Sequence, residues 1–131
     1  MLKKIILLAS LVFCFTTFAN TNKTPQFTSH KKLIVVSPGK TFAVTLQSNP
    51  TTGFSWKLVS YDESLVTLVG HHYYPPTNKK LMGAPGYEMW TFEAKKANYA
   101  VNQVGHVRMT YARPWEKTKT QIVSFIVVVR K

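Results

Sequence analysis

Apolar and polar residues alternate along most of this chain with a period of two, which is typical of strands half-buried in a sheet. β-Branched and aromatic residues dominate the alternating runs, and Gly, Pro and Asn separate them. No segment keeps the period of an amphipathic helix beyond about one turn. The pattern predicts seven strands, at Leu33–Val36, Thr41–Gln47, Phe54–Ser60, Thr67–Tyr74, Tyr87–Lys95, Gly105–Tyr111 and Gln121–Arg130.

Short strands separated by turns, in a chain of 131 residues, predict an all-β fold. We expect an immunoglobulin-like antiparallel β-sandwich of about seven strands, although a small barrel would give a similar pattern. The residues expected in its core are Trp56, Trp90, Phe92, Phe125 and the valines of Ile122–Val129.

The beginning of the chain does not follow this pattern. Two lysines precede an apolar run, Ile5–Phe15, that is short for a membrane span, and small residues lead up to Ala19. We therefore expect residues 1–19 to be a signal peptide with no retained membrane span, so that the mature protein is periplasmic or secreted. A retained anchor, or a lipid anchor at Cys14, is the alternative.

The rest of the chain is long enough for one domain and too short for two. Residues 20–32 are polar and are expected to form a flexible N-terminal segment, which leaves residues 33–131 as the domain. Cys14 is the single cysteine. Cleavage after Ala19 would therefore leave no thiol for a nucleophile, a thiolate metal site or a disulfide.

The mature chain is strongly basic. Removal of the leader leaves 15 Lys and Arg against 5 Asp and Glu, a net charge of +10. Such an excess favours encounter with anionic partners, such as an acidic protein or a polyanionic glycan, although it also serves solubility alone. Export argues against nucleic acid as the partner.

One short run interrupts two of the predicted strands: Asn49-Pro50-Thr51-Thr52-Gly53-Phe54. Pro50 fixes its own φ, and Gly53 permits a positive φ, so the run is a shaped loop. Phe54 and Trp56 are two residues apart and would point to one face of a strand, where we expect them to anchor the loop in the core.

Two other loops should lie beside this one, because alternate loops of an up-and-down sandwich emerge at the same end. We call the three the Pro50 loop (residues 49–53), the Gly83 loop (residues 75–86) and the Trp115 loop (residues 112–120). Each alone is compatible with an ordinary connection, and Trp115 could fold back over the sandwich. An exposed Trp nevertheless favours a binding role, and the predicted clustering favours a shared one.

The motifs of these loops resemble those of the chagasin family of cysteine-protease inhibitors over about residues 33–130. The Pro50 loop with Phe54 and Trp56, the glycine-rich segment of the Gly83 loop, and Arg113-Pro114-Trp115 occur in the family's order and spacing. The middle motif departs from the usual Gly-x-Gly-Gly, because Pro85 takes its third position and removes a backbone donor.

The resemblance implies an immunoglobulin-like fold whose three loops form a wedge in the active-site cleft of a papain-like cysteine protease. Nothing in the sequence requires more than a monomer. Thr51 and Thr52 would cover the catalytic cysteine and histidine, Gly83–Gly86 would line one side of the groove, and Trp115 the other. We expect no cofactor. The expected protease-binding residues are Asn49, Pro50, Thr51, Thr52, Gly53, Phe54, Leu81, Met82, Gly83, Ala84, Pro85, Gly86, Arg113, Pro114 and Trp115.

Two other classes of function compete with this interpretation. An enzyme is disfavoured, because the four histidines and five acids show no metal-ligand or catalytic-triad spacing. A secreted module that binds anionic glycans through Trp115, Tyr73, Tyr74 and the lysines is the alternative function. The inhibitor requires Trp115 and Thr52 at one end of the fold, and finding them at opposite ends would exclude it.

Overall fold

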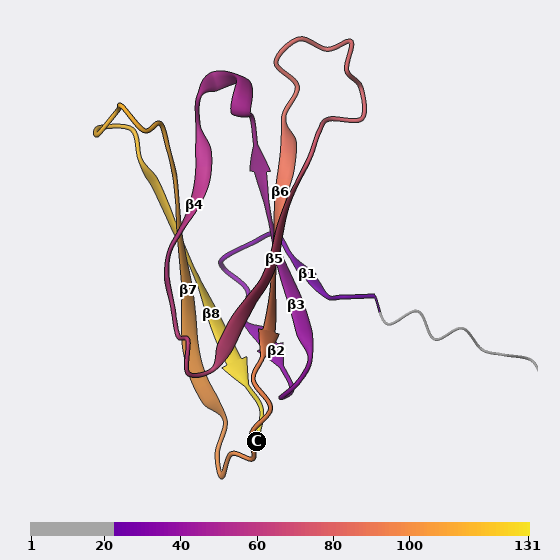
Figure 1. Cartoon of the computed structure of the whole chain (residues 1–131), viewed down its shortest axis with the longest axis vertical. Helices are drawn as coiled ribbons and strands as arrows, with labels where there is room; N and C mark the ends of the chain where they lie inside the picture. The colour runs from indigo at the N-terminus through magenta and orange to yellow at the C-terminus, as the bar shows by residue number, and fades with distance from the viewer. Residues whose placement is uncertain (1–22) are drawn as a thin grey trace, which may run out of the picture.

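The structure, a computed structural model, describes residues 23–131 as two four-stranded sheets packed face to face (Figure 1). The predicted signal peptide and Cys14 lie outside the described residues. The sheet orders are β1-β3-β6-β5 and β2-β8-β7-β4. The strands are β1 (Gln26–Phe27), β2 (Ile34–Val36), β3 (Thr41–Ser48), β4 (Ser55–Tyr61), β5 (Val66–Tyr74), β6 (Gly86–Ala94), β7 (Gln103–Ala112) and β8 (Gln121–Val129).

All seven predicted strands are present, with ends displaced by no more than two residues, so the predicted β-sandwich is confirmed. The N-terminal part differs from the prediction. The segment expected to be flexible contains β1, which pairs in parallel with β3, and β2 pairs in parallel with β8. The sheets are therefore not wholly antiparallel, because the chain adds β1 to the edge of one sheet and then crosses to add β2 to the edge of the other.

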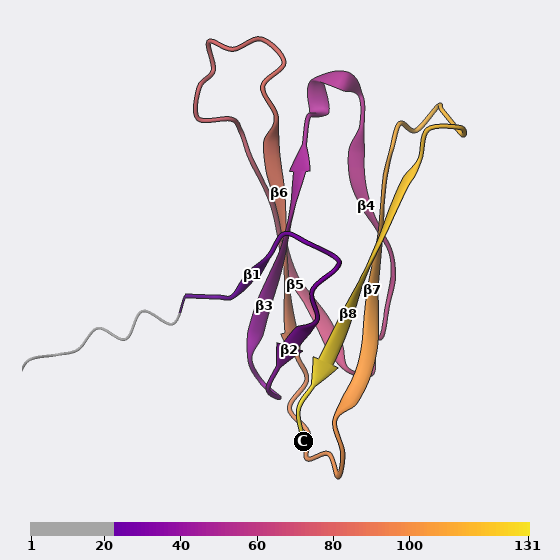
Figure 2. The same cartoon turned by 180° about the vertical axis from the view of Figure 1, so that it is seen from behind.

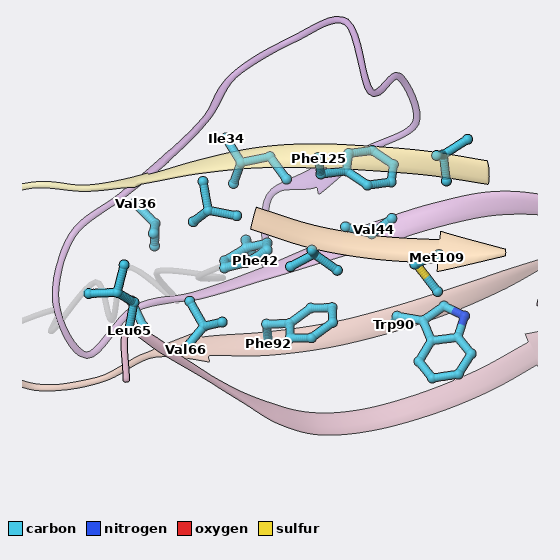
Figure 3. Close-up of a cluster of buried hydrophobic side chains, with 14 of the residues drawn as sticks. Ile34, Val36, Phe42, Val44, Leu65, Val66, Trp90, Phe92, Met109 and Phe125 are labelled. Carbon is cyan, nitrogen blue, oxygen red and sulfur yellow. The ribbon is translucent and has the colours of Figure 1, made fainter. Parts of the chain in front are cut away.

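The core lies between the two sheets and is built mainly from alternate residues of the longer strands (Figure 3). Phe42 and Phe92, from neighbouring strands, stack with ring centroids 5.5 Å apart. The predicted core residues Trp56, Trp90, Phe92 and Phe125 are all buried. Of the predicted valines, Val128 is the exception, because the period of two turns it outward while Val123, Val127 and Val129 point inward.

The three loops singled out in the sequence emerge together at one end of the sandwich (Figures 1 and 2). The β4–β5 and β6–β7 connections and the C-terminus lie at the opposite end. Within residues 23–131, no helix is long and apolar enough to cross a membrane. The two sheets therefore hold the three loops next to one another at one end of the fold.

Candidate functional site: three loops at one end of the sandwich

The Pro50 loop is closed by its own hydrogen bonds. Pro50–Thr52 form one turn of 3-10 helix, which Gly53 ends with a φ of 82°. The amides of Thr52 and Gly53 donate to the carbonyls of Asn49 and Pro50, at 3.1 and 3.0 Å. Both threonine hydroxyls donate to Asn49 at 2.6 Å, Thr51 to its side-chain oxygen and Thr52 to its carbonyl. The loop is consequently shaped before any partner arrives.

Two further hydrogen bonds join the Pro50 loop to its neighbours. Asn49 Nδ2 donates to the carbonyl of Gly83 at 3.1 Å, and Arg113 Nε donates to the carbonyl of Thr52 at 2.8 Å. Each such bond contributes about 0.5–1.5 kcal/mol. The central loop is thereby connected to both outer loops, and the three form one surface.

Trp115 lies on the outside of this surface and remains 72% exposed. One edge of its ring approaches Gly53 closely: a Cβ at Gly53 would lie 2.6 Å from Trp115 Cη2. Glycine is therefore favoured at position 53 by its backbone conformation, and a larger residue there would displace the Trp115 ring. Trp115 does not fold into the end of the sandwich, and it lies at the same end as Thr52, as the inhibitor hypothesis requires.

Phe54 is not the core anchor that the sequence predicted. It is only half-buried and lies one residue before β4, past the end of the paired strands. Its ring stacks on Tyr111 at 5.2 Å between centroids, and the Arg113 guanidinium lies 4.4 Å from its centroid. Trp56, two residues later, is buried and contacts the same Tyr111 at 4.9 Å. Only Trp56 anchors the loop in the core.

A buried carboxylate, which sequence reasoning missed, lies beneath the Pro50 loop. Glu88 of β6 is 4% exposed, and its Oε1 accepts from Ser48 Oγ at 2.7 Å and from the Trp56 amide at 3.4 Å. Its Oε2 lies 2.7 Å from His71 Nε2. Ser48 precedes the loop and Trp56 follows it, so one carboxylate holds both ends. The sequence could have indicated its burial, because Glu88, Trp90 and Phe92 are spaced two apart and therefore lie on the same, inward face of their strand.

Tyr111 is a second residue that the sequence did not single out. Its hydroxyl accepts a hydrogen bond from the Asn49 amide at 2.9 Å, while its ring contacts Phe54 and Trp56. Tyr111 therefore holds Asn49, at the start of the Pro50 loop, and also Phe54 and Trp56, which follow the end of the loop.

The Gly83 loop presents apolar side chains to solvent. Leu81 is 62% exposed and Met82 is fully exposed. Gly83 has a φ of 78° and open space around it, whereas Gly86 is buried against β5 at the start of β6. These two neighbouring exposed apolar side chains make the Gly83 loop a candidate contact surface. The exposed Pro85 has no amide hydrogen to donate there.

The sequence comparisons agree with this geometry. A model of the chagasin family of peptidase inhibitors, I42, matches residues 35–129. The protein belongs to the chagasin family. It is 40% identical to chagasin of Trypanosoma cruzi over 88 residues, which cover 63% of this chain and 73% of that protein. Membership in an inhibitor family confirms the prediction that the protein is not an enzyme.

Solved structures of other proteins share its fold. The cysteine protease inhibitor EhICP2 from Entamoeba histolytica matches with a TM-score of 0.66 and 21% identity, over 82% of this chain and 96% of that one. Amebosin matches with a TM-score of 0.62 and 20% identity, over 82% of this chain and 98% of that one. PbICP-C, solved in complex with falcipain-2, matches with a TM-score of 0.56 and 18% identity, over 84% of this chain and 92% of that one. The predicted immunoglobulin-like sandwich is the common fold of this group.

In this family member, the structure brings all the predicted site residues to one end of the sandwich. They divide among the Pro50, Gly83 and Trp115 loops, with Phe54 at the base of the first. Glu88, Ser48 and Tyr111 lie beneath them and position the central loop. No cluster of metal-ligating side chains occurs among residues 23–131.

Proposed function

We propose that this protein is a reversible, tight-binding inhibitor of papain-like cysteine proteases that inserts its three loops as a wedge into the active-site cleft. The observation that carries the proposal is the joining of the loops by the Asn49–Gly83 and Arg113–Thr52 hydrogen bonds. A surface that is already ordered loses little conformational entropy on binding, which favours high affinity for a small contact area.

The Pro50 loop has the properties needed to cover a catalytic cysteine without being cleaved. The carbonyls of Asn49, Pro50 and Thr52 all accept hydrogen bonds within the protein. These hydrogen bonds hold the peptide groups in a closed turn, so the loop would have to open before a carbonyl could take the near-attack geometry that cleavage needs. We therefore propose that Thr51 and Thr52 occlude the catalytic centre as a folded turn and are not processed as a substrate.

The two outer loops would contact the cleft on either side of this turn. Leu81 and Met82 offer exposed apolar side chains on one side, and Trp115 offers a large aromatic ring on the other. A buried aromatic anchor contributes about 2 kcal/mol or more to binding when it is a hot spot. Because Pro85 lacks an amide hydrogen, we expect the Gly83 loop to bind through its side chains and its remaining amides.

The test is a titration of the mature protein, residues 20–131, against papain and a cathepsin L-like enzyme, with trypsin as the control. We expect inhibition of both cysteine proteases at one inhibitor per enzyme, full recovery of activity after dilution, and an intact inhibitor by mass spectrometry. Trypsin should retain its activity. Absence of inhibition of both cysteine proteases would refute the proposal, and retention on an immobilised polyanionic glycan would then support the alternative function.

We further propose that residues 1–19 are removed during export and that the mature protein acts in the periplasm or outside the cell as a monomer. The basic and apolar leader and the small residues before Ala19 support this. Mass spectrometry of protein from the extracytoplasmic fraction should find Asn20 as the first residue. Light scattering should give the mass of one chain. A product that begins at a lipid-modified Cys14 would contradict the proposed cleavage.

A further inference from the structure

The positive charges near the proposed wedge are not evenly distributed over its loops. Lys79 and Lys80 belong to the Gly83 loop, and Lys117 and Lys119 belong to the Trp115 loop; all four are exposed. The Pro50 loop between them contains no ionisable side chain. Figures 1 and 2 show the two lysine-bearing loops on opposite sides of the Pro50 loop.

These lysines are not neutralised by the protein's own acids. The three loops contain a single carboxylate, Glu116, which pairs with Arg113 at 3.2 Å. Among the described residues, no carboxylate lies within 4.0 Å of any of the four lysines, since the ion pairs found there involve Arg113 and two histidines. Four free positive charges therefore flank an uncharged centre as two pairs.

We infer that the target protease carries acidic residues on both rims of its active-site cleft. The inference rests on the proposed function: if the Pro50 loop enters the cleft, the two outer loops and their lysines lie over its opposite rims. Positive charges there attract acidic rims and repel basic ones, which changes mainly the association rate and the choice of partner.

The location of these charges matters more than the net charge of the protein. Charges are screened over about 10 Å at 0.1 M salt. Strand β3, of eight residues, extends about 26 Å along the sandwich. The exposed Lys40, Lys95, Lys96 and Lys131 at the far end are therefore screened from a protease bound at the loops. Substitution of these four lysines therefore provides a control that changes the net charge by the same amount as substitution of the four loop lysines.

The experiment compares two quadruple variants of the mature protein, K79E/K80E/K117E/K119E at the loops and K40E/K95E/K96E/K131E at the far end. Both lower the net charge by the same amount, and thermal unfolding verifies that both fold. Association and dissociation rates are measured by stopped flow at about 0.1 M and about 1 M salt, where charges are screened over about 10 and about 3 Å. The targets are two papain-like proteases, one with acidic and one with basic cleft rims.

At about 0.1 M salt, where the far-end charges are screened, we expect the loop variant to associate with the acidic-rimmed protease about 10- to 100-fold more slowly than the wild type, a magnitude typical of electrostatic steering. Its dissociation rate should change less than about threefold, and the difference should fade at high salt. The far-end variant should stay within about threefold of the wild type. The basic-rimmed protease should bind the loop variant faster than the wild type.

The double variants K79E/K80E and K117E/K119E test the two rims separately. A slowing confined to one of them would overturn the inference of acidic residues on both rims. If the wild type inhibits both proteases at equal, salt-independent rates, the inference is overturned while the proposed function stands. If the wild type inhibits neither, the proposed function fails, and the inference fails with it.

Discussion

The contact between Gly53 and Trp115 can be probed by adding one methyl group. In Gly53→Ala the new Cβ would lie 2.6 Å from Trp115 Cη2 and 3.0 Å from Cζ2. Atoms cannot remain at the shorter of these distances, so the indole must move. Because the ring is mostly exposed, it can move away from the Pro50 loop without disturbing the core. The substitution therefore displaces the proposed anchor and leaves its chemistry unchanged.

Two free energies follow from this geometry. Alanine at a φ of 82° costs about 1–2 kcal/mol, since the left-handed region crowds a Cβ. This lowers the free energy of unfolding and should lower the melting temperature by several degrees. Displacement of a hot-spot aromatic costs about 2 kcal/mol of binding, which is about a 30-fold rise in the inhibition constant.

The matched control is Gly39→Ala. Gly39 has a φ of 76° and lies far from the three loops, and its added Cβ would meet only the flexible side chain of Lys96, at 3.1 Å. It should lose similar stability and keep full inhibition. In a Trp115→Ala background, Gly53→Ala should weaken inhibition little further, because the group that it displaces is already absent.

Inhibition constants against papain and urea unfolding curves for the single and double variants complete the assay. Fully additive losses for Gly53→Ala and Trp115→Ala would refute the coupling, because the two residues would then act separately. Unchanged inhibition by Gly53→Ala would show that the observed position of Trp115 has no part in binding.

Three other predictions follow from the loops and their support. Trp115→Ala and a bulky Thr51→Phe should each weaken inhibition of papain at least about 30-fold with little change in melting temperature, because both residues are exposed; equal losses of stability would show a structural role only. Glu88→Ala should lower the free energy of unfolding in urea by about 2–4 kcal/mol, because it leaves buried donors without an acceptor, whereas Glu88→Gln, which keeps an acceptor, should lose less; equal losses would contradict this account. Arg113→Lys removes the Nε donor to Thr52 and should weaken inhibition about 5- to 10-fold, since that bond contributes about 1 kcal/mol; a fully active lysine variant would show that charge alone suffices.

Much of the site could be predicted because its parts are local. Pro50 and Gly53 determine a turn through their own backbone preferences, and an up-and-down order of strands places alternate loops together. The role of Phe54 could not be predicted in this way. Its period-two relation to Trp56 places both residues on one face, but only Trp56 lies where the opposite sheet can cover it.

Contacts between residues far apart in the chain could not be predicted from a single sequence. The Asn49–Gly83 bond joins residues 34 apart, and the Arg113–Thr52 bond joins residues 61 apart. Glu88 could be recognised as an acid on an inward face, but its partners Ser48 and Trp56 come from two other strands, one of them in the opposite sheet. Each contact depends on how the sheets pack.

The sequence by itself determined seven of the eight strands, which loops share an end and most of the residues that face inward, because alternation and turn preferences act within a few neighbouring residues. Only the tertiary structure decided that β1 and β2 pair in parallel on the edges of different sheets. It also decided that the three loops are joined into one surface and that a buried carboxylate holds the central one. Hydrogen bonds form only within a few tenths of an ångström of the right distance, and the packing of two whole sheets sets those distances.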